Sequence, residues 1–208
     1  MFLFDLIVPR HCAFCACPLM ADETCICTGC FGDLPWNATP LAGDPGVLEI
    51  RIAMLRYEFP VDVAIKALKF RRKLFYAPAF AQVLLEGGKL LPDDLDAVLP
   101  VPLHWRRETR RGFNQAIELA KPIAKALDLP LLKGVRRRKS TVYQSGLRAE
   151  ARRQNLRGAF SVRKRLRCRH VLIIDDVTTT GTTLQQLAST LRQSGVPKVS
   201  ALTVAEAQ

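Results

Sequence analysis

Two adjacent acids and a run of hydroxyls lie together near the end of the chain, in VLIIDDVTTTGTT at residues 171–183. Carboxylates such as Asp175 and Asp176 accept hydrogen bonds from sugar hydroxyls, and threonine hydroxyls donate them to phosphate oxygens. Gly181 permits a sharp bend and the close approach of a phosphate. These residue types predict a site for a phosphorylated sugar.

A strand and a helix must position these groups. Residues 171–174, Val-Leu-Ile-Ile, form the apolar run expected of a central parallel strand covered on both faces. The segment LQQLASTLRQSG has helical spacing and a stop at Gly195. In an open α/β sheet, ligands bind beyond the carboxyl ends of the strands, where a helix N-terminus offers N–H groups to phosphate. The alternative is an ordinary strand-end turn with a capped helix, whereas a Walker B site would need a GxxxxGK[ST] loop, which the chain lacks.

This segment resembles the signature of the type I phosphoribosyltransferases, in which an apolar strand and two aspartates precede a Thr- and Gly-rich loop. The resemblance implies that Asp175 and Asp176 contact the ribose hydroxyls of phosphoribosyl diphosphate (PRPP), with Mg²⁺ bridging pyrophosphate and ribose oxygens. The residues that it implies around the 5′-phosphate are Thr178, Thr179, Thr180, Gly181, Thr182 and Thr183.

A second strand-to-helix passage precedes this one. An apolar strand at residues 97–101 leads through a basic loop into a helix near Asn114. By the same resemblance, residues 104–115 hold the pyrophosphate, and Arg107 and Arg111 stabilise the charge that develops on it. Residues 140–160 are polar and basic, as expected of a mobile lid that excludes water from the site.

Six of the seven cysteines lie between residues 12 and 30. The spacing of Cys12, Cys15, Cys27 and Cys30 gives two CxxC turns, the pattern of a closed structural zinc site. Cys17 and Cys25 are further candidate ligands, and His11 is a weaker one. A disulfide framework is disfavoured in a reducing cytoplasm, and a redox CxxC normally occurs once, at the start of a helix. The sequence therefore predicts structural zinc.

The net charge of +12 is concentrated in the middle of the chain, where residues 104–170 hold 20 of the 31 Lys and Arg but four acidic residues. A solvated basic face is one interpretation; we favour a surface for phosphates or nucleic acid. Candidate stacking residues for single-stranded DNA are Trp105, Phe113, Tyr143 and Phe160, although core packing suits Phe113 and Phe160 better.

The whole chain resembles the ComF family, also seen as GntX-like proteins. The resemblance rests on the paired CxxC turns, YEFPVDVAIKALKF, PVPLHWRRETRRGFNQ, residues 144–160 and the aspartate–threonine loop. It implies a type I phosphoribosyltransferase-like parallel sheet flanked by helices, with a small N-terminal zinc-ribbon module and a role in natural competence. The expected units are a zinc-ribbon-like module at residues 1–35, a hood or connecting region at 36–90, and the phosphoribosyltransferase-like domain at 91–208.

Two functions follow from these expectations. One is a protein of DNA uptake or utilisation that binds PRPP or a related phosphate ligand with Mg²⁺, and single-stranded DNA through its basic surface. The alternative is an active phosphoribosyltransferase of nucleobase or nucleotide metabolism. We expect a cytoplasmic protein without membrane insertion, because its apolar runs fall far short of the roughly 20 residues of a membrane helix. Its partners could include a second copy of the chain or other competence or DNA-processing proteins.

Overall fold

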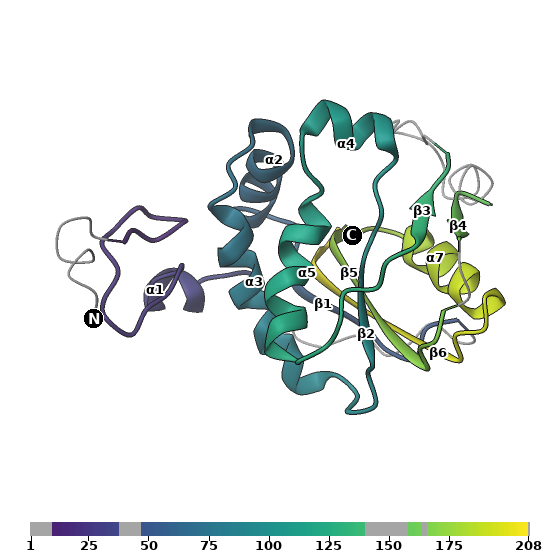
Figure 1. Ribbon diagram of the computed structural model, residues 1–208. Helices are drawn as coiled ribbons and strands as arrows, with labels where there is room; N and C mark the ends of the chain where they lie inside the picture. Colours follow the sequence, from purple (N-terminus) through teal and green to yellow (C-terminus); the bar gives the residue numbers. More distant parts are fainter. Residues whose placement is uncertain (1–9, 38–46, 140–157, 164–165, 208) are drawn as a thin grey trace.

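A computed structural model describes residues 10–37, 47–139, 158–163 and 166–207. Its centre is a four-stranded parallel sheet with the strand order β1-β6-β5-β2 (Figure 1). The bounds of these strands are Arg51–Arg56 for β1, Lys198–Glu206 for β6, His170–Thr178 for β5 and Ala97–Pro100 for β2. This arrangement confirms the predicted α/β fold with a parallel sheet flanked by helices.

Strand β5 is central because its side chains are apolar on both faces. Leu172 and Ile174 belong to one core cluster, and Val171 and Ile173 belong to the other, so the alternation has the period of two expected of a strand. All four side chains are fully buried, as the continuous apolar run predicted.

Helices cover both faces of the sheet. One core cluster packs beneath three helices: α2 (Val61–Arg71), α3 (Tyr76–Gly87) and α5 (Gln115–Ala126). The other packs beneath α7 (Thr182–Gln193). A 3₁₀ turn at Gly88–Leu90 follows α3 directly, and a break at residues 72–75 separates α2 from α3.

Residues 51–87, expected as part of a hood or connecting region, are built into this sheet and its cover. Strand β1 pairs with β6 over the register Arg51↔Ala201 to Arg56↔Glu206. The proposed division into three units stays a prediction, but β1 and the two helices after it share their core with β5 and β6.

The second, antiparallel sheet has two short strands, β3 (Val135–Arg137) and β4 (Phe160–Val162), which lie beside β2 and α7 (Figure 1). Most of the expected lid, residues 140–157, falls outside the described residues. Phe160, at the end of that segment, is buried at 5 % exposure, which confirms core packing in place of DNA stacking.

The N-terminal module contains the short helix α1 (Thr28–Gly32) and packs on α3. The Phe14 ring meets Tyr76 and Phe80 edge to face, at centroid distances of 5.9 and 6.2 Å. The Thr24 hydroxyl donates a hydrogen bond to Gln82 Oε1 at 2.6 Å. Within the described residues, no helix is long and apolar enough to cross a membrane.

Candidate functional site

Asp175 and Asp176 lie inside β5, and this corrects the prediction that the strand ends before them. Strand β6 runs alongside far enough to pair Thr178 with Glu206, so the ladder of backbone hydrogen bonds continues through both acids. Tertiary pairing here overrides the low strand preference of aspartate. The connecting turn is therefore short, because α7 already begins at Thr182.

Asp176 is buried at 3 % exposure and faces a lysine from a different part of the chain. Lys69 Nζ, on α2, lies 2.9 Å from Asp176 Oδ2, an ion pair whose geometry falls outside a well-directed hydrogen bond. Burial lowers the pKa of Lys69, but the Asp176 carboxylate overcomes this and raises it, so the lysine stays charged. Lys69 was not among the predicted site residues, although it lies one turn from Ile65, on the buried stripe of α2.

Asp175 has a pKa well above the ordinary value of an aspartate. Burial, reinforced by the charge of Asp176, raises the pKa of Asp175 to about 7, and Lys69 opposes the shift. Two carboxylates this close cannot both ionise without cost. A ligand with hydroxyl groups therefore meets one carboxylate paired with Lys69 and a second whose pKa burial has raised.

The turn into α7 is shaped for an anion. Gly181 has φ +69° and caps the helix, and a Cβ there would lie 2.8 Å from Arg51 Nη1. A hydrogen bond of 2.7 Å connects Thr180 Oγ1 and Thr182 Oγ1. Thr178 Oγ1 is buried without a hydrogen-bond partner among the described residues. The N–H groups and dipole of this 12-residue helix favour a negative group at its start.

The predicted phosphate-loop residues are therefore distributed over three elements. Thr178 ends β5, Thr179, Thr180 and Gly181 form the turn, and Thr182 and Thr183 open α7. Thr178 and Thr182 are buried, and Thr180 is exposed.

The basic segment after β2 is a helix, which corrects its prediction as a loop. Helix α4 (Trp105–Arg111) starts where His104 Nδ1 accepts a hydrogen bond from the Arg106 N–H at 3.3 Å, and it ends at Gly112 with φ +83°. Both cap residues, and the helix-forming Arg and Glu between them, are sequence features that indicate a helix. Asn114 caps α5 next, close to the predicted helix start.

Two arginines, one on α4 and one on β3, lie close enough to the aspartates for their charges to interact. Burial lowers the pKa of Arg111, and the carboxylates of Asp176 and Asp175 oppose the shift. The pKa of Arg137, on β3, is likewise lowered by burial and by the charge of Arg107, and the charge of Asp175 opposes this shift. Arg107, Arg111 and Arg137 are thus close enough to interact with the site or with one another, and they remain cations. Arg137 is an addition to the predicted set.

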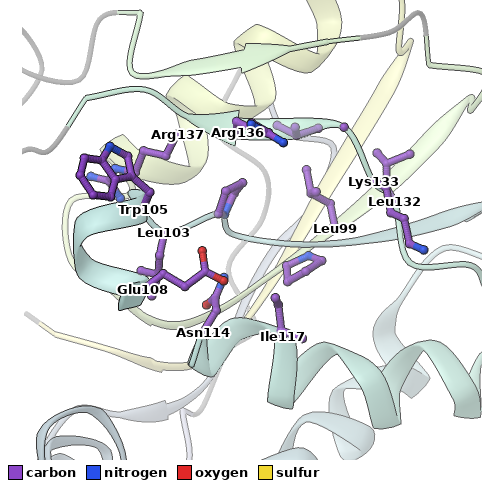
Figure 2. Close-up of a pocket in the computed structure, with 14 residues that line it drawn as sticks. Leu99, Leu103, Trp105, Glu108, Asn114, Ile117, Leu132, Lys133, Arg136 and Arg137 are labelled. Atoms are coloured by element: carbon purple, nitrogen blue, oxygen red, sulfur yellow. The ribbon is translucent and has the colours of Figure 1, made fainter. Parts of the chain in front are cut away.

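A cavity of about 390 Å³ adjoins this cluster on the outer side of β2, within the size range of small-molecule sites. Figure 2 shows Trp105 and Arg137 at one end and Leu132 and Lys133 at the other. Glu108 and Asn114 contribute polar groups to its wall. The cavity has an apolar floor, including Leu99 and Ile117, and a rim with cations.

The predicted metal ligands come together in the N-terminal module. The sulfurs of Cys12, Cys15, Cys27 and Cys30 all lie within 4.8 Å of one another, and the four could hold a metal ion. Cys15 Sγ and Cys27 Sγ are 3.6 Å apart, close to the roughly 3.8 Å that tetrahedral Zn–S bonds of about 2.3 Å require. Cys17 and Cys25 fall outside this group.

A third cluster has the residue types of a nucleophilic triad. His170 Nδ1 lies 2.6 Å from Asp94 Oδ1, and its Nε2 lies 2.8 Å from Ser200 Oγ. Ser200 is 0 % exposed, and His170 begins β5 at the opposite end from the aspartates. No substrate can reach this hydroxyl, so the cluster ties the starts of β5 and β6 together.

Comparisons with known proteins agree with this geometry. Residues 114–208 match the family model described as a phosphoribosyl transferase domain. Competence protein F of Haemophilus influenzae is 36 % identical over 163 residues, which cover 73 % of this chain and 70 % of that protein. DNA utilization protein YhgH of Escherichia coli O157:H7 is 31 % identical over 220 residues, 93 % of this chain and 96 % of that protein.

Among solved structures, a glutamine PRPP amidotransferase from B. subtilis, complexed with ADP and GMP, aligns at a TM-score of 0.41 and 21 % identity. The alignment covers 61 % of this chain and 26 % of that protein.

Proposed function

The chain belongs to the ComF family, and from that premise we propose that it acts in competence or DNA utilisation by binding PRPP, or a related sugar phosphate, with Mg²⁺ beside a surface for single-stranded DNA. One observation carries the phosphate part of this proposal. The paired aspartates lie near the carboxyl end of β5, a few residues before α7, and interact with Lys69, Arg111 and Arg137.

The chemistry of the donors fits PRPP group by group. The ribose hydroxyls would donate to Asp175 and Asp176, and the 5′-phosphate would accept from the Thr178–Gly181 turn and the first N–H groups of α7. Arg107 and Arg111 would face the diphosphate. Arginine suits this role because its guanidinium remains charged even where burial lowers its pKa.

Mg²⁺ would arrive with the diphosphate and neutralise part of its charge. Within the described part of the chain, the four cysteines form the one group of three or more metal-ligating side chains. A magnesium ion would therefore be held largely through oxygens of the ligand, with water completing its shell. Zinc, held by the four cysteines, would have a purely structural role.

Isothermal calorimetry with PRPP and Mg²⁺ tests the phosphate site. Wild-type protein should release heat and saturate, and the double variant Asp175→Asn, Asp176→Asn should lose that binding. Absence of heat at millimolar PRPP, or unchanged binding in the double variant, would reject the site.

The cavity beside Trp105 favours a second candidate, an active phosphoribosyltransferase. A planar nitrogen nucleophile could occupy its apolar floor. In that reaction the nucleophile forms a bond to the sugar carbon as the bond to pyrophosphate breaks, and the departing group takes the negative charge, which Arg107 and Arg111 would stabilise. PRPP-dependent pyrophosphate release across a panel of nucleobases and nucleotides tests turnover; its absence with every acceptor leaves binding as the function.

A further inference from the structure

The end of α2 and the turn into α3 expose six residues in a row, Phe70 to Phe75. Three of them are cations, Arg71, Arg72 and Lys73, and apolar side chains stand on both sides of them. Phe70 is 69 % exposed and Phe75 is 52 % exposed. Between Asp62 and Glu86 the chain has five basic residues and no acidic one. The segment thus combines exposed aromatic rings with positive charges that have no acidic residue near them in the sequence.

Helix α4 lies against this turn. The Arg111 guanidinium sits over the Phe70 ring, 5.5 Å from its centroid. Arg72 Nη2 lies 3.4 Å from the position that a Cβ on Gly112 would take, at the end of α4. The turn and the helix therefore form one continuous surface, which we call the α2–α4 platform, although 30 residues and more separate them in the sequence.

The side chains of α4 differ in their exposure. Arg107 and Arg111, one turn apart, are partly buried, and the charge of Arg111 interacts with the aspartates. Trp105 is 62 % exposed, with the Arg106 guanidinium 5.3 Å from its ring centroid. Trp105 and Arg111 stand at opposite ends of the helix, about 9 Å apart along its axis. Aromatic rings and cations thus alternate across the platform.

We propose that the α2–α4 platform binds single-stranded nucleic acid, with bases stacked on Phe70, Phe75 and Trp105 and backbone phosphates on the arginines and lysine between them. This inference rests on the DNA part of the proposed function and assigns it a location. Exposed aromatic rings with cations beside them are what a single strand requires, since its bases are free to stack. A duplex keeps its bases stacked on one another.

The platform keeps Trp105 from the predicted basic surface, adds residues 70–75, and connects this surface to the proposed phosphate site. Arg137 lies over the Phe160 ring at 5.5 Å and interacts with Asp175, so this arginine of the predicted basic segment faces inward. On the platform, Phe70 directly follows Lys69, the partner of Asp176, and shares Arg111 with the aspartate site. A strand on the platform would pass along the rim of that site.

Anionic membranes also attract exposed aromatic and basic residues, and a partner protein could cover them. The shape of the ring separates these cases. Stacking needs a flat ring, whereas insertion into lipid or a protein contact needs apolar bulk, which leucine preserves. Phe70→Leu and Trp105→Leu are therefore the informative variants, and Val63→Ala is the matched control, because Val63 is 51 % exposed on the same helix.

The proposal is tested by fluorescence anisotropy, which measures the affinity of the full chain for a labelled 20-nucleotide oligo-dT at a series of salt concentrations. We expect each leucine variant to weaken binding by about tenfold, with a salt dependence like that of the wild type, and Val63→Ala to bind as the wild type does. Thermal unfolding of each variant checks that it is folded.

Three outcomes overturn the proposal in different ways. If both leucine variants bind oligo-dT as tightly as the wild type does, the platform is rejected as the binding surface, but the DNA part of the proposed function stands. No oligo-dT binding by the wild type removes both, while the PRPP titration stands separately. Binding to phosphatidylserine vesicles, with oligo-dT affinity unchanged in Phe70→Leu, assigns the surface to lipid.

Discussion

Lys69 Nζ lies 2.9 Å from Asp176 Oδ2 and joins helix α2 to the carboxyl end of the central strand β5. The side chains are 20 % and 4 % exposed, so the pair is largely shielded from water. It links a segment expected to form a hood to the aspartates of the proposed phosphate site. An approaching sugar phosphate would therefore meet a carboxylate already fixed in place.

Replacement of Lys69 by methionine should destabilise the protein, because it leaves the Asp176 carboxylate buried without its cation. Loss of one partner from a buried ion pair costs roughly 3 kcal/mol in free energy of unfolding. Urea unfolding at pH 7 measures the difference. Lys69→Met combined with Asp176→Asn should recover much of the loss, and equal stability of Lys69→Met and the wild type would contradict the pairing.

Asp175 should make the protein less stable as the pH rises. Its pKa is about 7 in the folded chain against an ordinary value of 3.8, so the folded state keeps a proton that the unfolded state has lost. Stability therefore falls between about pH 4 and 7. Asp175→Asn should remove this part of the decline, which thermal midpoints across a pH series would reveal as a growing advantage of the variant.

Asp94 provides a control of opposite sign. Hydrogen bonds from Lys198 and His170 lower the pKa of Asp94 to about 2. Its contribution to stability is present above about pH 4 and is lost as the pH falls towards 2. Asp94→Asn should thus reduce the thermal midpoint at neutral pH. If the thermal midpoint of Asp94→Asn, relative to the wild type, also rose with pH as that of Asp175→Asn should, the effect would be a general one of removing a negative charge.

Gly181→Ala should weaken both the fold and PRPP binding. An alanine at φ +69° costs about 1 kcal/mol, and its Cβ would press on Arg51, whose flexible end must shift. Gly88→Ala is the matched control, since Gly88 has φ −56° and open space around it. Calorimetry and urea unfolding measure the two effects; equal behaviour of the two variants would count against a strained phosphate turn.

The N-terminal module should contain one zinc ion per chain. Cys15→Ser and Cys27→Ser should each lower the zinc content measured by elemental analysis, while Cys17→Ser should retain it, because Cys17 lies outside the four-sulfur group. Removal of zinc by a chelator should also lower the thermal midpoint, since Cys12 and Ile26 of the module belong to the main core cluster. Zinc loss in Cys17→Ser alone would reassign the ligands.

Local patterns in the sequence were enough to locate the central strand and the cysteine cluster of this protein. The apolar run before Asp175 and Asp176 identified the central strand, and the two CxxC turns identified the four gathered sulfurs, because each pattern has its meaning within a few neighbouring residues. The caps of α4 at His104 and Gly112 were equally local signals, although the high positive charge of the segment favoured its prediction as a loop.

Only the tertiary structure decided which distant side chains meet those patterns. Lys69 reaches Asp176 across more than 100 residues, and Arg137 reaches Asp175 from a separate small sheet. The length of β5 was decided in the same way, since β6 supplies hydrogen-bond partners as far as Thr178. Such contacts depend on how helices and strands pack, and a linear sequence carries no local mark of them beyond a lysine on a buried stripe.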